Sequence, residues 1–272
     1  MGRYSRTCGD EHLKFTVNAK EFREAVDDCM LKGKYYSSSS KVGDYIYLEV
    51  SESENDSFEL RLWNADMSTI TMCAISATPT VEEGGLQLNE KVVFDTNNTN
   101  GFLKDLGENI TLSLERGRLV LSTNDTNLSI SIMTEHPYEG AIDMVKGNSM
   151  PLANEFQSSM TLPSFGKTQY ETALEMDNNE FATAVKMAER IGMGFKLHYT
   201  IRDGLAISAE SNSQNFTRNV MPLTSEGEAS IVEISAPIYK FFNENFWLFL
   251  KDESPVFACS SNRFIIRAPR IS

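Results

Sequence analysis

The sequence predicts an α+β protein made of two tandem domains of the same kind, and three observations lead to this prediction. An alternating strand, a polar cap and an amphipathic helix occur in Lys14–Met30 and again in Ala173–Glu189. A second pair of stretches, Glu108–Ser122 and Glu244–Ser260, has the pattern strand, tight turn, strand. At 272 residues, the chain is long enough for two domains with a core each. A duplicated domain accounts for all three.

The first helix of each domain is predicted by an apolar stripe at helical spacing. The two stripes match at a constant offset of 159 residues. Each domain also has a shorter helical patch, at the end of Val92–Leu106 and of Ile231–Phe242. The stripes are Phe22, Ala25, Val26, Cys29 and Met30 in the first domain, and Phe181, Ala184, Val185 and Ala188 in the second.

The strands are predicted by stretches in which apolar and polar residues alternate. Arg202-Asp203-Gly204 is expected to turn one hairpin of the second domain. The predicted strands are Tyr45–Val50, Phe58–Trp63, Ile70–Ala77 and Asn127–Met133 in the first domain, and Phe195–Thr200, Leu205–Ala209, Asn215–Met221 and Ile231–Ile234 in the second.

The domain boundaries follow from the repeat. Residues 1–12 are expected to be a loose N-terminus, residues 13–133 the first domain, residues 134–169 an interdomain connector and residues 170–272 the second domain. No periodicity persists in the connector, which six proline and glycine residues interrupt. We expect a linker that lies across a surface; a plain tether is the alternative.

Composition indicates an intracellular globular protein without catalytic chemistry. The chain is 41% hydrophobic and 23% charged, has a net charge of −13, and shows no signal peptide and no membrane span. Its four cysteines have no paired spacing, so we expect buried free thiols. The histidines His12, His136 and His198 are scattered, and no phosphate loop or metal-spaced Cys/His set occurs. We therefore expect no enzyme activity, no cofactor and no metal.

Four stretches carry a resemblance to a known family. WNADMSTITM (Trp63–Met72), TIRDGLAISAES (Thr200–Ser211), KDESPVFA (Lys251–Ala258) and FIIRAPRI (Phe264–Ile271) are similar, in this order along the chain, to DNA sliding clamps of the proliferating cell nuclear antigen type. Ala65 stands where that family usually has methionine. The similarity runs from about Leu13 to the end of the chain. Clamps of tailed phages share the architecture and are not separated from this lineage by the sequence.

The resemblance implies two tandem clamp domains, with β-sheets outside and two short helices per domain inside. It implies a polymerase processivity factor: a ring, expected to be a homotrimer, that encircles duplex DNA and tethers replication and repair enzymes. Expected partners are DNA polymerase, other proteins with a short apolar clamp-binding motif, and a clamp loader. Localisation would be cytoplasmic or nucleoid in a prokaryote or virus-infected cell, and nuclear in a eukaryote. A subunit of a hetero-ring and a monomeric processivity factor are the alternatives.

Six basic residues are candidates to face DNA. They lie opposite the apolar positions of the four helical stretches, and their contacts would be independent of base sequence. Glu24, Asp27, Asp28 and Glu189 share these faces, so solvated mixed-charge surfaces are the alternative. The six candidates are Lys20, Arg23, Lys104, Lys186, Arg190 and Lys240.

The resemblance also implies a groove for partner peptides and a subunit contact. The contact would join Asn127–Met133 of one subunit to Asn215–Met221 of the next. An exposed apolar patch beside a strand edge suits a short helical or extended peptide. For Ile266 the alternative is strand core, and for Pro269 a simple chain stop. The groove residues implied are Ala65, Ser68, Ile70, Ile142, Met144, Pro255, Ile266, Ala268, Pro269 and Ile271.

Overall fold

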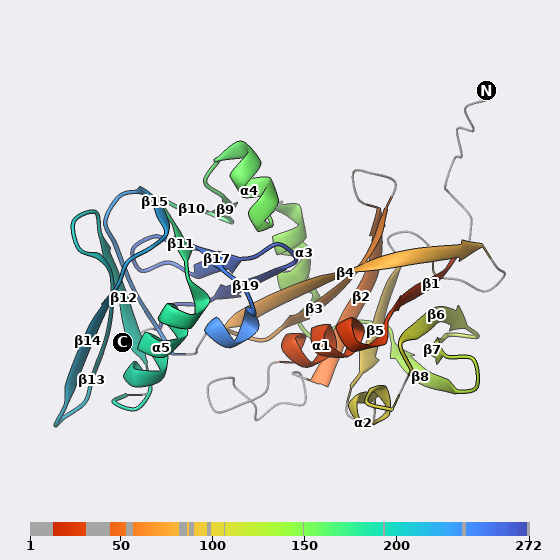
Figure 1. Cartoon of the computed structure of the whole chain (residues 1–272). Coiled ribbons are helices and arrows are strands. Elements are labelled where there is room, and N and C mark those ends of the chain that lie inside the picture. The colour runs from red at the N-terminus through yellow and green to blue at the C-terminus, as the bar shows by residue number, and fades with distance from the viewer. Residues whose placement is uncertain are drawn as a thin grey trace. The chain divides into compact units, whose positions relative to one another are not determined.

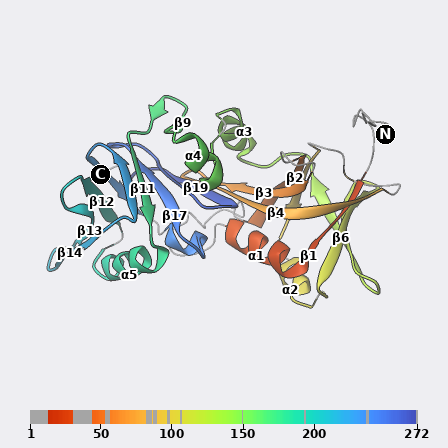
Figure 2. The ribbon, with the colours of Figure 1, turned by 45° about the horizontal axis from the view of Figure 1, so that its top comes forward.

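The computed structural model describes residues 13–30, 44–52, 57–81, 86, 90–96, 99–105, 107–148, 150–192, 194–235 and 238–270. It divides into two compact, sheet-rich units with few helices (Figures 1 and 2). The described parts of residues 1–30, 41–64 and 73–137 form the first unit, and those of 65–72 and 138–272 form the second. The predicted N-terminal segment 1–12 lies outside the described residues, and the predicted domain boundaries stay a prediction.

The first unit is a circuit of antiparallel strands with two helices. The strand order is β1-β6-β7-β8-β5-β2-β3-β4, and β4 also pairs with β1, so every strand in the circuit has two neighbours. The elements are β1 (Leu13–Asn18), α1 (Ala19–Cys29), β2 (Tyr45–Glu52), β3 (Phe58–Ala65), β4 (Thr69–Val81), β5 (Lys91–Asp95), α2 (Thr99–Leu103), β6 (Asn109–Glu115), β7 (Arg118–Ser122) and β8 (Asn127–Met133).

The second unit contains two larger sheets. Five strands have the order β19-β18-β17-β11-β15, and four have the order β14-β13-β12-β16, with α5 against the latter (Figure 1). The elements are β11 (Thr172–Met176), α5 (Asn178–Ala188), β12 (Phe195–Thr200), β13 (Gly204–Glu210), β14 (Asn215–Val220), β15 (Thr224–Gly227), β16 (Ser230–Ile234), the 3-10 turn η2 (Tyr239–Phe241), β17 (Phe246–Leu250), β18 (Val256–Cys259) and β19 (Arg263–Arg267).

The predicted repeat of strand and helix is present. Helices α1 and α5 start and end 159 residues apart, the offset that their apolar stripes predict. Each is capped at its N-terminus by a side chain: Asn18 accepts hydrogen bonds from the backbone N–H groups of Lys20 and Glu21, and Asp177 accepts one from Glu180. The predicted stripe residues are buried in both helices. The second helix of the second unit is only the 3-10 turn η2.

The connector contains secondary structure that its aperiodic sequence did not indicate. It contains α3 (Glu139–Gly147), α4 (Ala153–Ser159) and a small hairpin of β9 (Ser164–Phe165) and β10 (Thr168–Gln169). Helix α4 lies against the five-stranded sheet, because the Phe156 ring packs edge-on at 4.8 Å from both Trp247 and Phe249. Tertiary packing stabilises such short helices where sequence period is too brief to reveal them.

Two further expectations concern cysteines and membranes. Cys29, Cys73 and Cys259 are buried and form no disulfide among the described residues, and Cys8 lies outside them. In the part of the chain that the structure describes, no helix has the length and apolar character needed to cross a bilayer.

Candidate nucleic-acid and partner interfaces

The second unit gathers basic side chains where α5 meets η2. Lys186 lies in the last turn of α5, Arg190 follows the helix, and Lys240 belongs to η2; all three are exposed. The ring of Tyr239 lies 5.3 Å from Nζ of Lys186 and 5.9 Å from Nζ of Lys240, measured to the ring centroid. Lys186 and Lys240 are thus brought to one aromatic side chain from distant parts of the sequence.

The three candidates in the first unit have a more acidic setting. Nζ of Lys20 lies 3.8 Å from a carboxylate oxygen of Glu24, one helical turn away. Arg23 is half-buried, and Lys104 is exposed just beyond α2. Helix α1 also carries Glu21, Asp27 and Asp28. The alternative of a solvated mixed-charge face therefore fits this unit better than the second.

Sequence reasoning missed Arg218. This residue belongs to β14, which packs against α5, and its Nη1 lies 3.7 Å from the sulfur of Met187. It thus adds a fourth cation beside Lys186 and Arg190. The alternation within Asn215–Val220 was the available signal, since it places Arg218 on the same face as Phe216 and Val220.

The predicted groove residues divide by burial. All nine that the structure describes belong to the second unit, and Ile271 lies outside the described residues. Met144 is 44% exposed, whereas Ser68, Pro255, Ala268 and Pro269 are half-buried. The buried ones are Ala65, Ile70, Ile142 and Ile266, which contribute to the core rather than to an exposed lip.

The turn between β3 and β4 is joined to the C-terminal tail. One carboxylate oxygen of Asp66 accepts hydrogen bonds from the N–H groups of Ser68 and Thr69, both at 2.7 Å. The N–H of Ala268 in turn donates to the carbonyl of Ser68 at 2.8 Å. This brings the predicted residues Ser68 and Ala268 together and leaves Met67, which sequence reasoning omitted, 82% exposed at the turn.

Arg267 anchors the start of that tail. Its guanidinium is buried and donates to the hydroxyls of Ser68 at 2.8 Å and Ser235 at 3.0 Å, and also to that of Thr69. The sequence analysis gave Arg267 no role, because its hydrogen-bond partners are distant in the sequence.

The end of the tail borders a hollow. The N–H of Arg270 donates to the carbonyl of Glu233 at 2.7 Å, and the two side chains form an ion pair at 3.0 Å. Beside this pair lies a hollow of about 450 Å³, which contains one predicted groove residue, Pro269. It is lined by Lys196, Ile231, Val232, Glu233, Glu253, Pro269 and Arg270.

The strands predicted to join subunits differ in how far they are paired. Strand β14 pairs only with β13 and ends the four-stranded sheet. Strand β8 pairs with β7 over Asn127–Ser131, and it meets β5 only at Ile132 and Met133. In the described part of the chain, both strands therefore present backbone groups that no neighbouring strand pairs.

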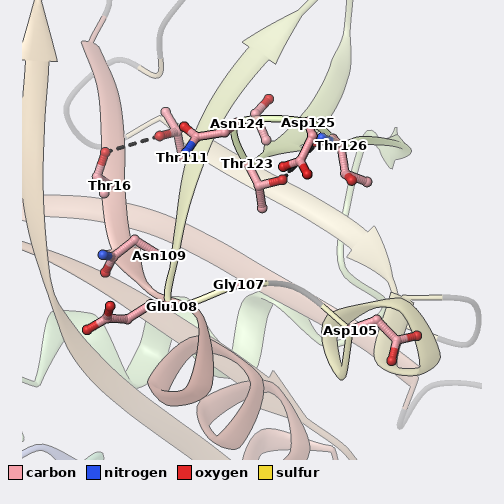
Figure 3. A pocket seen from close by; sticks show the side chains of 11 residues that line it. Thr16, Asp105, Gly107, Glu108, Asn109, Thr111, Thr123, Asn124, Asp125 and Thr126 are labelled. Carbon is pink, nitrogen blue, oxygen red and sulfur yellow. Dashed lines mark hydrogen bonds between the residues drawn. The ribbon is translucent and has the colours of Figure 1, made fainter.

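A polar hollow of about 700 Å³ lies in the first unit (Figure 3). The carboxylates of Asp105, Glu108 and Asp125 border it, and the hydroxyl oxygens of Thr16 and Thr111 lie 3.1 Å apart at its edge. It contains none of the predicted site residues. Among the described residues, no group of His, Cys, Asp and Glu side chains has the arrangement of a metal site.

Comparisons with known proteins bear on the fold. No family model and no curated protein matches the chain. Its structure superposes on the DNA polymerase III subunit beta from Pseudomonas aeruginosa with a TM-score of 0.68 at 13% identity, covering 100% of this chain and 69% of that one. The fold is that of a DNA sliding clamp.

Two other solved structures agree. A beta clamp from Helicobacter pylori in complex with 5-chloroisatin gives a TM-score of 0.65 at 14% identity, over 95% of this chain and 64% of that one. Another beta clamp from H. pylori, bound to a DNA ligase peptide, gives a TM-score of 0.64 at 14% identity, over 95% of this chain and 67% of that one. The chain thus spans about two thirds of the length of these structures. These structures confirm a clamp fold. Because they are bacterial clamps, the closer resemblance to clamps of the proliferating cell nuclear antigen type stays a prediction.

Proposed function

We propose that this chain is a DNA polymerase sliding clamp, a processivity factor that encircles duplex DNA and tethers replication and repair enzymes. The observation that carries the proposal is the clamp fold over 95–100% of the chain. In this role the protein holds other enzymes on DNA, inside the cell, and needs no catalytic residues and no cofactor. The sequence motifs further favour the two-domain type related to the proliferating cell nuclear antigen.

The ring is proposed to be a homotrimer closed by strand pairing. A closed ring of identical subunits needs two different, complementary edges on each subunit. The unpaired side of β14 and the partly unpaired side of β8 meet that need within one chain. A hetero-ring subunit or a monomeric processivity factor is the second candidate, and solution mass distinguishes them.

The DNA contact is proposed to be electrostatic and independent of base sequence. Lys186, Arg190 and Lys240, with Arg218 beside them, form the stronger basic face, and Lys20, Arg23 and Lys104 the weaker one. The net charge of −13 means that acidic residues outnumber basic ones, and a mostly acidic protein with local basic faces suits a ring that slides rather than grips. Contacts of this kind weaken steeply as salt rises.

The partner site is proposed to lie along the C-terminal tail of the second unit. One H. pylori neighbour is bound to a DNA ligase peptide, which supports a peptide as the occupant here. Ser68, Ala268 and Pro269, with Met67 exposed beside them and the hollow next to Pro269, offer mixed apolar and backbone contacts. The proposed partners are polymerase, repair enzymes and a clamp loader that carry a short apolar motif.

The test combines solution mass with retention on DNA. The subunit mass is 30.5 kDa, so light scattering should give three times that value over a range of concentrations. A loaded ring should remain on nicked circular DNA and leave after the circle is linearised. A stable monomer would support the second candidate. Equal loss from circular and linear DNA by an assembled trimer would contradict encirclement.

A further inference from the structure

Tyr239 has an unusual position for an aromatic residue of the second unit. Its side chain is almost fully buried, at 5% exposure, yet two exposed lysines lie over its ring. Lys186 reaches it from α5 at 5.3 Å and Lys240 from η2 at 5.9 Å, both within the range of about 6 Å in which an ammonium group is attracted to an aromatic face. One ring thus contacts two cations.

The elements that carry these lysines are fastened to each other. The side-chain amide of Asn178, the first residue of α5, donates a hydrogen bond to the carbonyl of Phe242 at 2.7 Å, directly after η2. The rings of Phe242 and Phe246 stack at 4.6 Å, and Phe246 packs edge-on against Phe181 of α5 at 5.3 Å. The fold therefore sets the backbone positions from which the two lysine side chains extend to the ring.

Among the described residues, the two ammonium groups have no anionic partner. Within the described ranges, neither Lys186 nor Lys240 forms an ion pair or a hydrogen bond, whereas Lys20 of the first unit lies 3.8 Å from Glu24. Two positive charges held beside one ring repel each other. An anion with several acceptor oxygens, placed between them, would relieve that repulsion and find both lysines already beside one ring.

We propose that Tyr239 holds Lys186 and Lys240 as one phosphate-binding pair, whose ligand is a phosphodiester of the DNA backbone. Tyr239 is a positioning residue: it is buried, so it acts through the lysines and not by contact with DNA. This inference rests on the proposed clamp function, and it adds that the two lysines act together. The basic residues outside the pair, such as Arg190, are expected to act independently of Tyr239.

The experiment measures how long the ring stays on circular DNA at several salt concentrations. Tyr239→Leu, which removes the ring, should shorten the half-life several-fold, whereas Tyr239→Phe, which keeps the aromatic face, should stay within about twofold of the unsubstituted protein. Lys186→Ala and Lys240→Ala together should lower the salt slope by about one phosphate contact, or roughly 0.9. Lys167→Ala, an exposed lysine in the β9–β10 hairpin, is the matched control and should change nothing.

Coupling among the variants tests the positioning role. In the Lys186→Ala/Lys240→Ala background, Tyr239→Leu should have no additional effect on the half-life, because the ring then has nothing to position. An equal loss in both backgrounds, or a loss in Tyr239→Phe as large as in Tyr239→Leu, would overturn the proposal. If Tyr239→Leu does not fold, a double-mutant cycle of Lys186→Ala and Lys240→Ala decides alone. Additive effects of the two single substitutions on the half-life would contradict a joint site.

A readout without DNA separates this inference from the proposed function. In the unsubstituted protein and in Tyr239→Phe, NMR should show ring-current shifts on the ε-methylene protons of Lys186 and Lys240, lost in Tyr239→Leu. Absence of these shifts would overturn the arrangement even in a protein that slides on DNA. Shifts present in a protein that circular DNA does not retain would instead refute the DNA ligand together with the clamp function, and leave Tyr239 as a purely structural contact.

Discussion

Helices α1 and α5 occupy equivalent places in the two units, and they keep the same core while presenting different charges. Phe22 and Phe181 are both buried, as are the alanine, valine and small residues that follow at helical spacing. Outward, α1 carries four carboxylates against two basic residues, whereas α5 carries one of each. The pair Lys20–Glu24 has no counterpart on α5, where Lys186 lies over Tyr239. A duplicated fold therefore preserves its packing and specialises its surface.

The two units also differ in what covers their sheets. Helix α4 adds Phe156 to an aromatic cluster with Trp247 and Phe249, and Tyr170 and Phe257 extend the cluster. In the first unit, Phe15 contacts Phe58 at 5.6 Å. Each unit contains one of the two tryptophans, Trp63 and Trp247, so each can be followed by its own fluorescence.

The largest expected effect comes from removing one buried ring per unit. Phe156→Ala and Phe15→Ala should each lower the free energy of unfolding by about 3–5 kcal/mol, because a buried aromatic is replaced by a cavity. Urea unfolding would be followed in single-tryptophan versions of the protein. Phe156→Ala should move the Trp247 transition more than that of Trp63, and Phe15→Ala should do the opposite. Equal shifts at both tryptophans would show that the units unfold as one.

A second comparison uses two glycines with positive φ. Gly227 in β15 has φ of +100°, and a Cβ there would lie 1.9 Å from the carbonyl oxygen of Glu171. Gly117, between β6 and β7, has φ of +70° with nothing within 4 Å. Gly117→Ala should lower the unfolding free energy by about 1–2 kcal/mol from backbone strain alone, and Gly227→Ala by at least about 3 kcal/mol from strain plus the clash. Thermal unfolding of both variants measures the difference; a smaller loss at Gly227 would contradict the close approach.

Charge reversal tests whether the second unit has the stronger basic face. Lys186→Glu with Arg190→Glu should shorten the half-life on circular DNA tenfold or more, because each reversal replaces attraction to phosphate with repulsion. A tenfold change corresponds to roughly 1.4 kcal/mol. Lys20→Glu with Arg23→Glu should have a smaller effect, since Glu24 already offsets Lys20. Light scattering should show unchanged assembly in both. An equal or larger effect from the first unit would reverse the assignment.

How far the sequence predicted these features depends on whether the signal was local. The apolar stripe of α5 and its N-terminal cap can be recognised from one short stretch of sequence, and the structure confirms them. The stripe includes Phe181, Ala184 and Val185. Helix α4 was missed because Phe156 orders it by packing on Trp247, which is 91 residues away. For Ile266 the sequence left strand core open as the alternative to a groove residue, and the structure shows it buried; for Ile142 the burial was not predicted, since it depends on which face of an element meets the core. The Tyr239 contact required two elements to be placed in space.

The smallest expected effect is pH-dependent and concerns Glu244, which occupies the place of Glu108 in the repeat. Burial acts to raise the pKa of Glu244. Hydrogen bonds from the Ser261 hydroxyl at 2.5 Å and N–H at 3.1 Å, together with the charge of Arg263, lower the pKa by more than burial raises it, so the net shift is downward. A lowered pKa means that the stabilisation is present above the unfolded-state pKa and is lost as pH falls through the folded-state value.

Glu244→Gln should therefore lower the unfolding free energy at pH 7 by less than about 1 kcal/mol, because the carboxylate is largely exposed. The difference from the unsubstituted protein should shrink as the pH falls through the acidic range where Glu244 takes up its proton. Ser261→Ala removes the hydroxyl hydrogen bond and keeps the backbone one, so it should act in the same direction with a smaller effect. In the first unit, no described residue donates a hydrogen bond to the side chain of Glu108, so Glu108→Gln should leave stability unchanged. Urea unfolding from pH 3 to pH 7 measures all three variants, and a loss in Glu108→Gln equal to that in Glu244→Gln would mean that the two glutamates have not diverged.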